Sequence, residues 1–347
     1  MRGRGAAFNP PNRFAHTARQ QDPDWDPAQE PAPATQFLRD SSASIITCND
    51  SPDIGYAASL NPYRGCEHGC AYCYARPTHE YLGFSAGLDF ETKIMVKEDA
   101  PELLRRELSS PKWTPQTLAL SGVTDPYQPV ERKLQLTRRC LQVLAEFRNP
   151  VSIVTKNHLV TRDCDLLKEL AAHQAAAVSL SITSLDGELV RQLEPRTSQP
   201  RLRLAAVEAL AQAGIPVGVL VAPVVPALTD HEIPAILGAA AKAGARWAGM
   251  QLVRLPFAVA PLFEQWLADH APLKKDKVLG RIRAVRGGKL NDSRFFTRFT
   301  GEGPWARQVA ALFEVACRRA GLQRDWPALS TAAFRRPTGA QMELFGR

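Results

Sequence analysis

The chain has 347 residues, of which 45% are hydrophobic and 22% charged, and its formal net charge at pH 7 is +8. This composition is ordinary for a globular protein, and because no run of about 18 apolar residues is present, the sequence excludes a membrane partner. The N-terminus lacks the apolar core and cleavage site of a secretory signal, so we expect a cytoplasmic protein. The positive charge favours an anionic partner without identifying one.

The predicted elements begin after an irregular segment. Residues 1–40 repeat Pro, Gln, Asp and Arg without a helical or strand period, which indicates a disordered or loosely attached arm. Short apolar runs then alternate with helical patterns. The predicted strands cover residues 57–63, 117–122, 151–156, 176–183, 215–223 and 247–255. The predicted helices that alternate with them include residues 136–147, 163–173, 201–214 and 232–244.

This alternation predicts an α/β fold with a parallel sheet that closes, or nearly closes, into a barrel. The pattern contains about six strand-helix units, fewer than the eight of a complete barrel. We therefore expect a partial (β/α)6 barrel over residues 41–255 that is open on one side. Residues 256–330 read as a helical, basic extension packed on the barrel, and residues 331–347 read as a tail.

Three of the seven cysteines, Cys66, Cys70 and Cys73, follow the first predicted strand with the spacing C-x3-C-x2-C. Crowded cysteines in an odd total favour a metal site in a reducing compartment over a disulfide framework. Three thiolates can ligate three irons of a [4Fe–4S] cluster and leave the fourth iron open to a ligand. A zinc site completed by His68 or His79, and cysteines without any ligand, are the alternatives at this point.

The segment NPYRGCEHGCAYCYARPTHEY, together with SGVTDPYQPVE and TKN, resembles the radical S-adenosylmethionine superfamily. Within it, the text is similar to the branch of uncharacterised proteins that resemble spore photoproduct lyase, a DNA repair enzyme. The resemblance covers roughly residues 53–255. It implies a [4Fe–4S] cluster and S-adenosylmethionine as cofactors, reductive cleavage of the latter into a 5′-deoxyadenosyl radical, and a flavodoxin or ferredoxin as electron donor. Lyase chemistry on DNA is the reaction that this branch implies.

Candidate cofactor-binding residues lie where the predicted strands end, because active sites of β/α barrels gather at the carboxyl ends of the strands. Lysine and asparagine there suit a carboxylate, ribose or phosphate, alternate hydroxyls face one side of a strand, and arginine holds a carboxylate with two hydrogen bonds. The candidates are Gly122, Thr124, Asp125, Lys156, Asn157, Ser181, Thr183 and Arg196. The resemblance implies a Gly-Gly-Glu-Pro-like motif at residues 122–125, and this chain departs from it.

Each candidate also has a structural explanation. Asp125 suits a turn or a helix cap, Lys156 suits a solvated strand end, and Arg196 suits a local salt bridge with Glu194. No catalytic residue is assigned. Spore photoproduct lyase uses a thiol as hydrogen-atom donor, but Cys140 and Cys164 lie in helical patterns that we expect outside the barrel.

Two C-terminal features suggest macromolecular partners. Basic residues interleave with Phe295, Phe296 and Phe299, which predicts contact with DNA or RNA, although solvated charges over buried rings explain the pattern equally well. The basic residues are Arg281, Arg283, Arg286, Arg294 and Arg298. The tail resembles the short peptide by which bacterial repair proteins bind the replication sliding clamp, with Gln341, Met342, Leu344 and Phe345 as its contacts.

Three functional hypotheses follow from the sequence. In the first, a radical enzyme acts on nucleic acid. In the second, a radical enzyme modifies a peptide or a metabolite. In the third, the chain is a non-catalytic iron–sulfur or zinc module that recruits partners.

Overall fold

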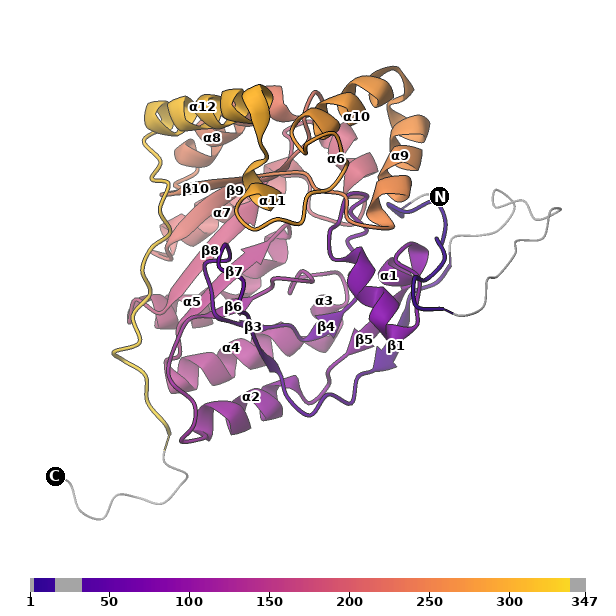
Figure 1. Ribbon diagram of the computed structural model, residues 1–347. Coiled ribbons are helices and arrows are strands. Elements are labelled where there is room, and N and C mark those ends of the chain that lie inside the picture. The colour runs from indigo at the N-terminus through magenta and orange to yellow at the C-terminus, as the bar shows by residue number, and fades with distance from the viewer. Residues whose placement is uncertain (1–2, 16–32, 338–347) are drawn as a thin grey trace, which may run out of the picture.

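A seven-stranded, mostly parallel sheet forms the centre of the computed structural model, which describes residues 3–15 and 33–337 (Figure 1). The strand order is β10-β9-β8-β7-β6-β3-β2, so parallel strands that follow one another along the chain are neighbours. The parallel strands are β3 (Ala58–Leu60), β6 (Leu118–Leu120), β7 (Val151–Thr155), β8 (Ala176–Ser181), β9 (Val217–Val224) and β10 (Ala248–Leu252). β2 (Ile46–Cys48) pairs antiparallel with β3, and β10 ends the sheet on the other side. The prediction of an open barrel of six strand-helix units is confirmed.

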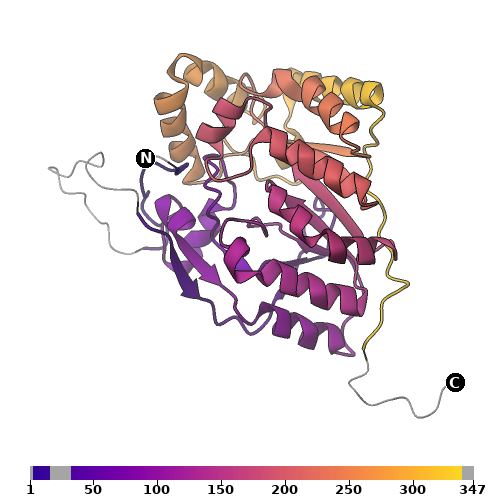
Figure 2. The same cartoon turned by 180° about the vertical axis from the view of Figure 1, so that it is seen from behind.

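The barrel strands are apolar runs covered on both faces, as a parallel sheet requires. All six residues of β8, for example, are buried. Helices cover the outer face of the sheet (Figure 2) and turn an apolar side toward it. These helices are α2 (Ala100–Ser109), α4 (Leu136–Phe147), α5 (Cys164–Ala171), α7 (Pro200–Gln212) and α8 (Ile233–Lys242). Short segments lead into them: α3 (Glu131–Leu134), η2 (His158–Asp163), α6 (Gly187–Leu193) and η3 (Asp230–Glu232).

A small second sheet lies beside the open barrel (Figure 1). It has the order β1-β5-β4, in which β1 (Gln36–Arg39) pairs parallel with β5 (Lys93–Val96) and β4 (Tyr63–Arg64) pairs antiparallel with it. The 3₁₀ helix η1 (Arg76–Leu82) and α1 (Leu88–Thr92) complete this unit. The sequence pattern did not predict this sheet. Its position matters because the three clustered cysteines lie between β4 and η1.

The chain after β10 returns to the outer layer. α9 (Val259–His270), η4 (Pro272–Lys274), α10 (Lys275–Ala284) and α11 (Thr297–Thr300) lead to α12 (Gly303–Ala320). α12 packs beside α8 as the last outer helix (Figure 1). The following segment runs past the amino ends of the strands, where the amides of Ser330 and Arg335 donate to the carbonyls of Gln174 and Phe147. No helix in the described ranges is both long and apolar enough to cross a bilayer.

Two predictions lie partly or wholly beyond the described residues. The clamp-binding contacts Gln341, Met342, Leu344 and Phe345 fall outside them, and so do residues 16–32 of the expected arm. The boundaries of the four predicted parts of the chain stay a prediction.

Candidate functional site

The cysteine loop connects β4 to η1 and crosses the carboxyl ends of the barrel strands. Gly65 and Gly69 have φ values of +81° and +66°, a left-handed conformation in which glycine is free of strain. The amide of Cys66 donates to the carbonyl of Phe90 at 2.9 Å, and the amide of Cys73 donates to the carbonyl of Cys70 at 3.2 Å. These turns direct the three cysteines toward one region.

The chemistry of this donor set fits an iron–sulfur cluster. Cys66, Cys70 and Cys73 are free thiols, and Cys66 lies close enough to the other two to influence their ionisation. Burial raises the pKa of the Cys70 thiol well above its ordinary value and that of Cys73 to about 11, so both are neutral without a bound cation. A cluster replaces those protons, because the thiolate is the form that binds metal. These three side chains would hold the cluster.

The histidines considered as zinc ligands have other partners. The Nδ1 atom of His68 lies 3.4 Å from Oδ2 of Asp125, and Nε2 of His79 lies 3.0 Å from the carbonyl of Lys93. In residues 3–15 and 33–337, no three Cys, His, Asp or Glu side chains are arranged to hold a single metal ion.

The buried ion pair of Arg76 and Glu91 holds the cysteine loop in place. Nε and Nη2 of Arg76 donate to the carbonyl of Cys70 at 3.0 and 2.8 Å, and Nη2 lies 2.5 Å from Oε1 of Glu91. Both side chains are completely buried. The Glu91 carboxylate also accepts from the amides of Gly5 and Ala6 at 3.1 and 2.9 Å. One carboxylate thus ties the loop to the N-terminal segment.

The N-terminal residues that the structure describes differ from the predicted loose arm. Gly5 lies so close to the loop that a Cβ atom there would stand 1.6 Å from the carbonyl oxygen of Gly69. Further along, Arg13 forms an ion pair of 2.7 Å with Glu80. We call residues 3–15 the N-terminal strap. The prediction was wrong for the strap because its contacts are made by backbone groups and glycines, which carry no periodic signal.

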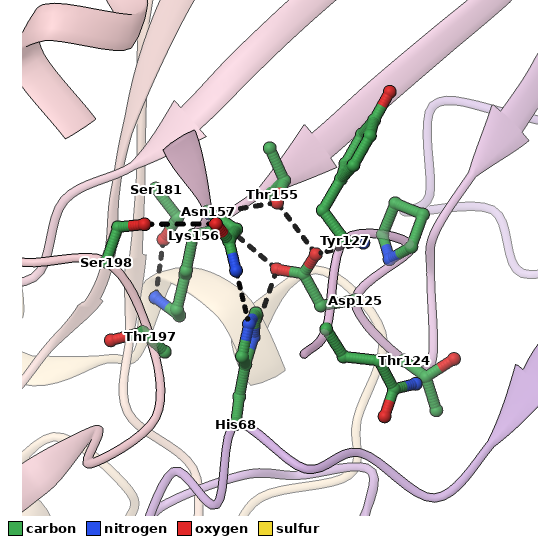
Figure 3. A network of polar contacts seen from close by, with 12 residues as sticks. His68, Thr124, Asp125, Tyr127, Thr155, Lys156, Asn157, Ser181, Thr197 and Ser198 are labelled. Carbon is green, nitrogen blue, oxygen red and sulfur yellow. Dashed lines mark hydrogen bonds and ion pairs between the residues drawn. The ribbon is translucent and has the colours of Figure 1, made fainter. Parts of the chain in front are cut away.

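A polar network occupies the carboxyl ends of β6 and β7 (Figure 3). The Asp125 carboxylate accepts from Oγ1 of Thr155 at 2.7 Å and from the amides of Tyr127 and Lys156 at 2.8 Å each. Burial opposes the ionisation of Asp125, but His68 and these donors lower its pKa overall. Burial likewise opposes protonation of His68, but Asp125 and Cys66 raise its pKa to about 10. The pair therefore anchors the cysteine loop to the barrel.

Neighbouring candidates have structural partners of their own. The Thr124 hydroxyl donates to the carbonyl of Tyr63 at 3.0 Å, and the carbonyl of Gly122 accepts from the Tyr74 hydroxyl at 2.6 Å. Asn157 caps η2 by accepting from the amide of Leu159 at 3.0 Å.

Lys156 is the centre of a second network. Its Nζ lies 2.7 Å from the Ser181 hydroxyl, 3.2 Å from the Thr183 hydroxyl and 2.9 Å from the carbonyl of Ala222. It also lies 3.2 Å from Oε1 of Glu194. Lys156, Ser181 and Thr183, predicted from the ends of two strands, are brought together beside the cysteine loop.

Glu194 and Arg196 do not form the local salt bridge that the sequence allowed. Glu194 is buried, pairs with Arg203 and Lys156, and accepts from the Tyr72 hydroxyl. Burial opposes its ionisation, but the two cations hold its pKa well below the usual range. Arg196 points to the other side of the loop, where its Nη1 lies 3.0 Å from Oε1 of Glu67.

The basic residues of the C-terminal extension are mostly paired. Arg298 binds Asp53, Arg294 binds Asp292 and Glu302, Arg283 lies 3.9 Å from Glu264, and Arg281 stacks 4.0 Å from the ring centroid of Trp305. The prediction that Arg286 contacts nucleic acid is wrong. Arg286 is 1% exposed and donates to the carbonyls of Leu252, Val253 and Thr297, so it closes the end of β10 and cannot reach a phosphate.

Cys140 lies buried in α4, and Cys164 begins α5. Both are on the outer helices, as expected from their helical patterns.

An open parallel β/α barrel whose mouth carries a loop with three free thiols, two of them buried, defines a class of enzyme that binds its cofactors at the strand ends. Residues 60–240 match the Radical SAM superfamily, and the chain belongs to this superfamily. Its members use a [4Fe–4S] cluster and S-adenosylmethionine, and they need a reductant.

Similar proteins extend this assignment. The uncharacterized protein Rv2578c of Mycobacterium tuberculosis is 41% identical over 221 residues, which are 63% of this chain and 65% of that protein. The uncharacterized protein MJ0683 of Methanocaldococcus jannaschii is 32% identical over 50% of this chain and 62% of its own length. The aligned region thus spans somewhat less than two thirds of these relatives.

Spore photoproduct lyase is similar in structure. Its complex with AdoMet and a dinucleoside spore photoproduct superimposes with a TM-score of 0.59 and 17% identity over 84% of this chain and 81% of that chain. This likeness shows a shared fold.

The sequence did not point to four charged side chains of the site. Arg76, Glu91, Arg203 and Arg254 are not among the predicted site residues, and only Arg254 lies at the end of a predicted strand, residues 247–255. The place of Arg254 at the end of a predicted strand was the one sequence signal that would have identified this residue.

Proposed function

We propose that this chain holds a [4Fe–4S] cluster through Cys66, Cys70 and Cys73 and uses it to cleave S-adenosylmethionine in a reaction on nucleic acid. The observation that carries the proposal is that Cys66, Cys70 and Cys73 lie close together on one loop beside Lys156, with Cys66 and Cys70 buried. When bound, the cluster supplies the electron that converts S-adenosylmethionine into methionine and a 5′-deoxyadenosyl radical. A flavodoxin or ferredoxin would deliver that electron.

The side chains at the mouth would bind and orient the cofactor. Lys156 is held by Glu194 and the carbonyl of Ala222, and it directs its ammonium group toward Ser181 and Thr183. An ammonium group carries three donors, so a bound carboxylate would replace one of the hydroxyl partners. The released hydroxyl would then be available to a ribose.

The remaining candidates would shape the pocket around this centre. Asp125 and His68 fix the loop, Asn157 fixes the start of η2, and the carbonyl of Gly122 and the hydroxyl of Thr124 hold the rim beside β6. Arg196 lies across the loop, and its role toward an anionic group would require release from Glu67. Burial of Glu194, Arg203 and Tyr72 keeps water from the centre of the site.

A nucleic-acid substrate is supported by the net charge of +8 and by the basic and aromatic side chains near the open side of the barrel. The exposed fractions of Phe295 and Phe296 are 50% and 63%, and the guanidinium of Arg298 lies 5.0 Å from the ring centroid of Phe295. The shared fold agrees with a reaction related to that of spore photoproduct lyase. Lyase chemistry and contact of the tail with a sliding clamp belong to the same proposal.

The test is anaerobic reconstitution followed by measurement of iron, sulfide and 5′-deoxyadenosine, with and without ultraviolet-irradiated DNA. Alanine at Cys66, Cys70 and Cys73 should abolish iron and sulfide incorporation and 5′-deoxyadenosine formation. Alanine at Cys48, an exposed cysteine on β2, is the matched control and should change neither.

Full iron and sulfide in the triple variant would overturn the cluster assignment. Unchanged S-adenosylmethionine in the reduced, cluster-loaded protein would favour a non-catalytic module. Formation of 5′-deoxyadenosine without any change in irradiated DNA would favour a peptide or metabolite substrate.

A further inference from the structure

Arg254 stands at the open side of the barrel, next to the cysteine loop. It follows β10 by two residues, and its guanidinium carbon lies 4.6 Å from the ring centroid of Tyr74 and 5.2 Å from that of Phe299. Tyr74 directly follows Cys73, and Phe299 belongs to α11, which lies beside β10 (Figure 1). The Tyr74 hydroxyl donates to the carbonyl of Gly122 at the end of β6, so this ring spans the opening.

Arg254 differs from the other inward-facing arginines of the chain. Arg76 and Arg203 pair with buried glutamates, and Arg286 donates to three carbonyls. In the part of the chain that the structure describes, Arg254 has no carboxylate within ion-pair distance and no side-chain hydrogen bond, and Asp53 beside it is engaged by Arg298. Partial burial and the nearby Arg298 cation lower the pKa of Arg254. Partial burial of the Arg254 guanidinium costs free energy, and no carboxylate of the described residues forms an ion pair that would offset this cost.

The rings of Tyr74 and Phe299 leave the N–H donors of the Arg254 guanidinium available to a ligand. Aromatic rings attract the face of this planar group, whereas its five N–H donors lie in its plane. Contact with Tyr74 and Phe299 therefore restricts the side chain and leaves those donors unpaired. A planar fork of this kind matches the oxygen atoms of a phosphate.

We propose that Arg254 binds a backbone phosphate of the nucleic-acid substrate at the open side of the barrel. The proposal rests on the proposed function, since it assumes that the substrate is a nucleic acid. Phosphate is favoured over the carboxylate of a peptide because exposed Phe295 and Phe296 lie on the segment just before α11, where unpaired bases can stack. Arg254 would thereby position the strand relative to the cysteine loop.

The experiment measures binding of a fluorescently labelled single-stranded oligonucleotide to the cluster-loaded full chain by anisotropy, under anaerobic conditions and over a series of salt concentrations. Arg254→Ala should weaken binding roughly tenfold, and the slope of log K against log salt concentration should become less negative by about 0.7, the contribution of one phosphate contact. Arg254→Lys should retain the slope because it retains the charge. Arg319→Ala, at an exposed position in the last turn of α12, is the control and should leave both quantities unchanged.

The outcomes separate this inference from the proposed function. If the wild-type chain binds the oligonucleotide and Arg254→Ala has the same affinity and slope, the assignment of Arg254 is overturned and the nucleic-acid substrate stands. If the wild-type chain does not bind, both fall, while 5′-deoxyadenosine formation still reports on the radical chemistry. Arg254→Ala should keep the thermal midpoint of the wild type, because within residues 3–15 and 33–337 this side chain makes no hydrogen bond that the fold would lose, and the change is then one of binding.

Discussion

Replacement of Glu91 by glutamine is expected to lower the free energy of unfolding by about 3 kcal/mol. Arg76 and Glu91 are both completely buried and lie 2.5 Å apart, so the substitution leaves a guanidinium without its counter-charge. Breaking such a pair costs about 3–5 kcal/mol, and the retained amide oxygen still accepts a hydrogen bond, which selects the lower end of that range. The loss is large beside a total stability of about 5–15 kcal/mol.

Urea denaturation of the cluster-free full chain measures this loss, with Glu146→Gln as the matched control. Glu146 pairs with Arg105 at the surface, where the two side chains are 35% and 47% exposed, and its substitution should cost less than about 1 kcal/mol. Because Arg76 also holds the carbonyl of Cys70, Glu91→Gln should retain less iron after gel filtration. Equal losses of stability in the two variants would refute the reasoning that burial makes the first pair strong.

Gly5→Ala should release the strap from Gly69 and lower iron retention, whereas Gly55→Ala, which meets no atom within 4 Å, should not; equal retention would contradict a role for the strap. Lys156→Met should weaken S-adenosylmethionine binding, measured by calorimetry, about tenfold or more through loss of a charge-assisted hydrogen bond; unchanged affinity would remove Lys156 from the site. Burial lowers the pKa of His79 to about 4, so the unfolded chain binds its proton first as the pH falls from about 6.5. Stability should therefore fall by about 3 kcal/mol between pH 6.5 and 4, and His79→Gln should remove that part of the pH dependence in urea titrations; an unchanged slope would show that His79 titrates normally.

The barrel was predictable because its signal is local. Each parallel strand is an apolar run followed by an amphipathic helix, and consecutive units must lie side by side with one handedness. The small sheet was not predictable for the opposite reason. β1 (Gln36–Arg39) is four residues long and mostly exposed, and it exists only because β5, more than fifty residues later, supplies its hydrogen bonds. No pattern within β1 contains that information.

The candidate site divides in the same way. Lys156, Ser181 and Thr183 could be grouped from the sequence, since the carboxyl ends of neighbouring parallel strands lie at one edge of a sheet. The partner of Glu194 could not be identified, because Arg196 and Arg203 are equally plausible by spacing and only the path of α7 decides between them. The prediction for Arg286 was wrong because the sequence does not distinguish an arginine that closes the end of a strand from an arginine that faces solvent.

The two halves of the site are built for different requirements. Around the cysteine loop, the completely buried cations are paired, Arg76 with Glu91 and Arg203 with Glu194, and this rigid arrangement excludes water from a reactive centre. At the open side, Arg254 has no such partner among the described residues and neighbouring rings are exposed, as a surface must be before its ligand arrives. Substitutions at the open side should therefore alter what is bound while leaving cluster retention intact, whereas substitutions in the buried pairs should do the reverse.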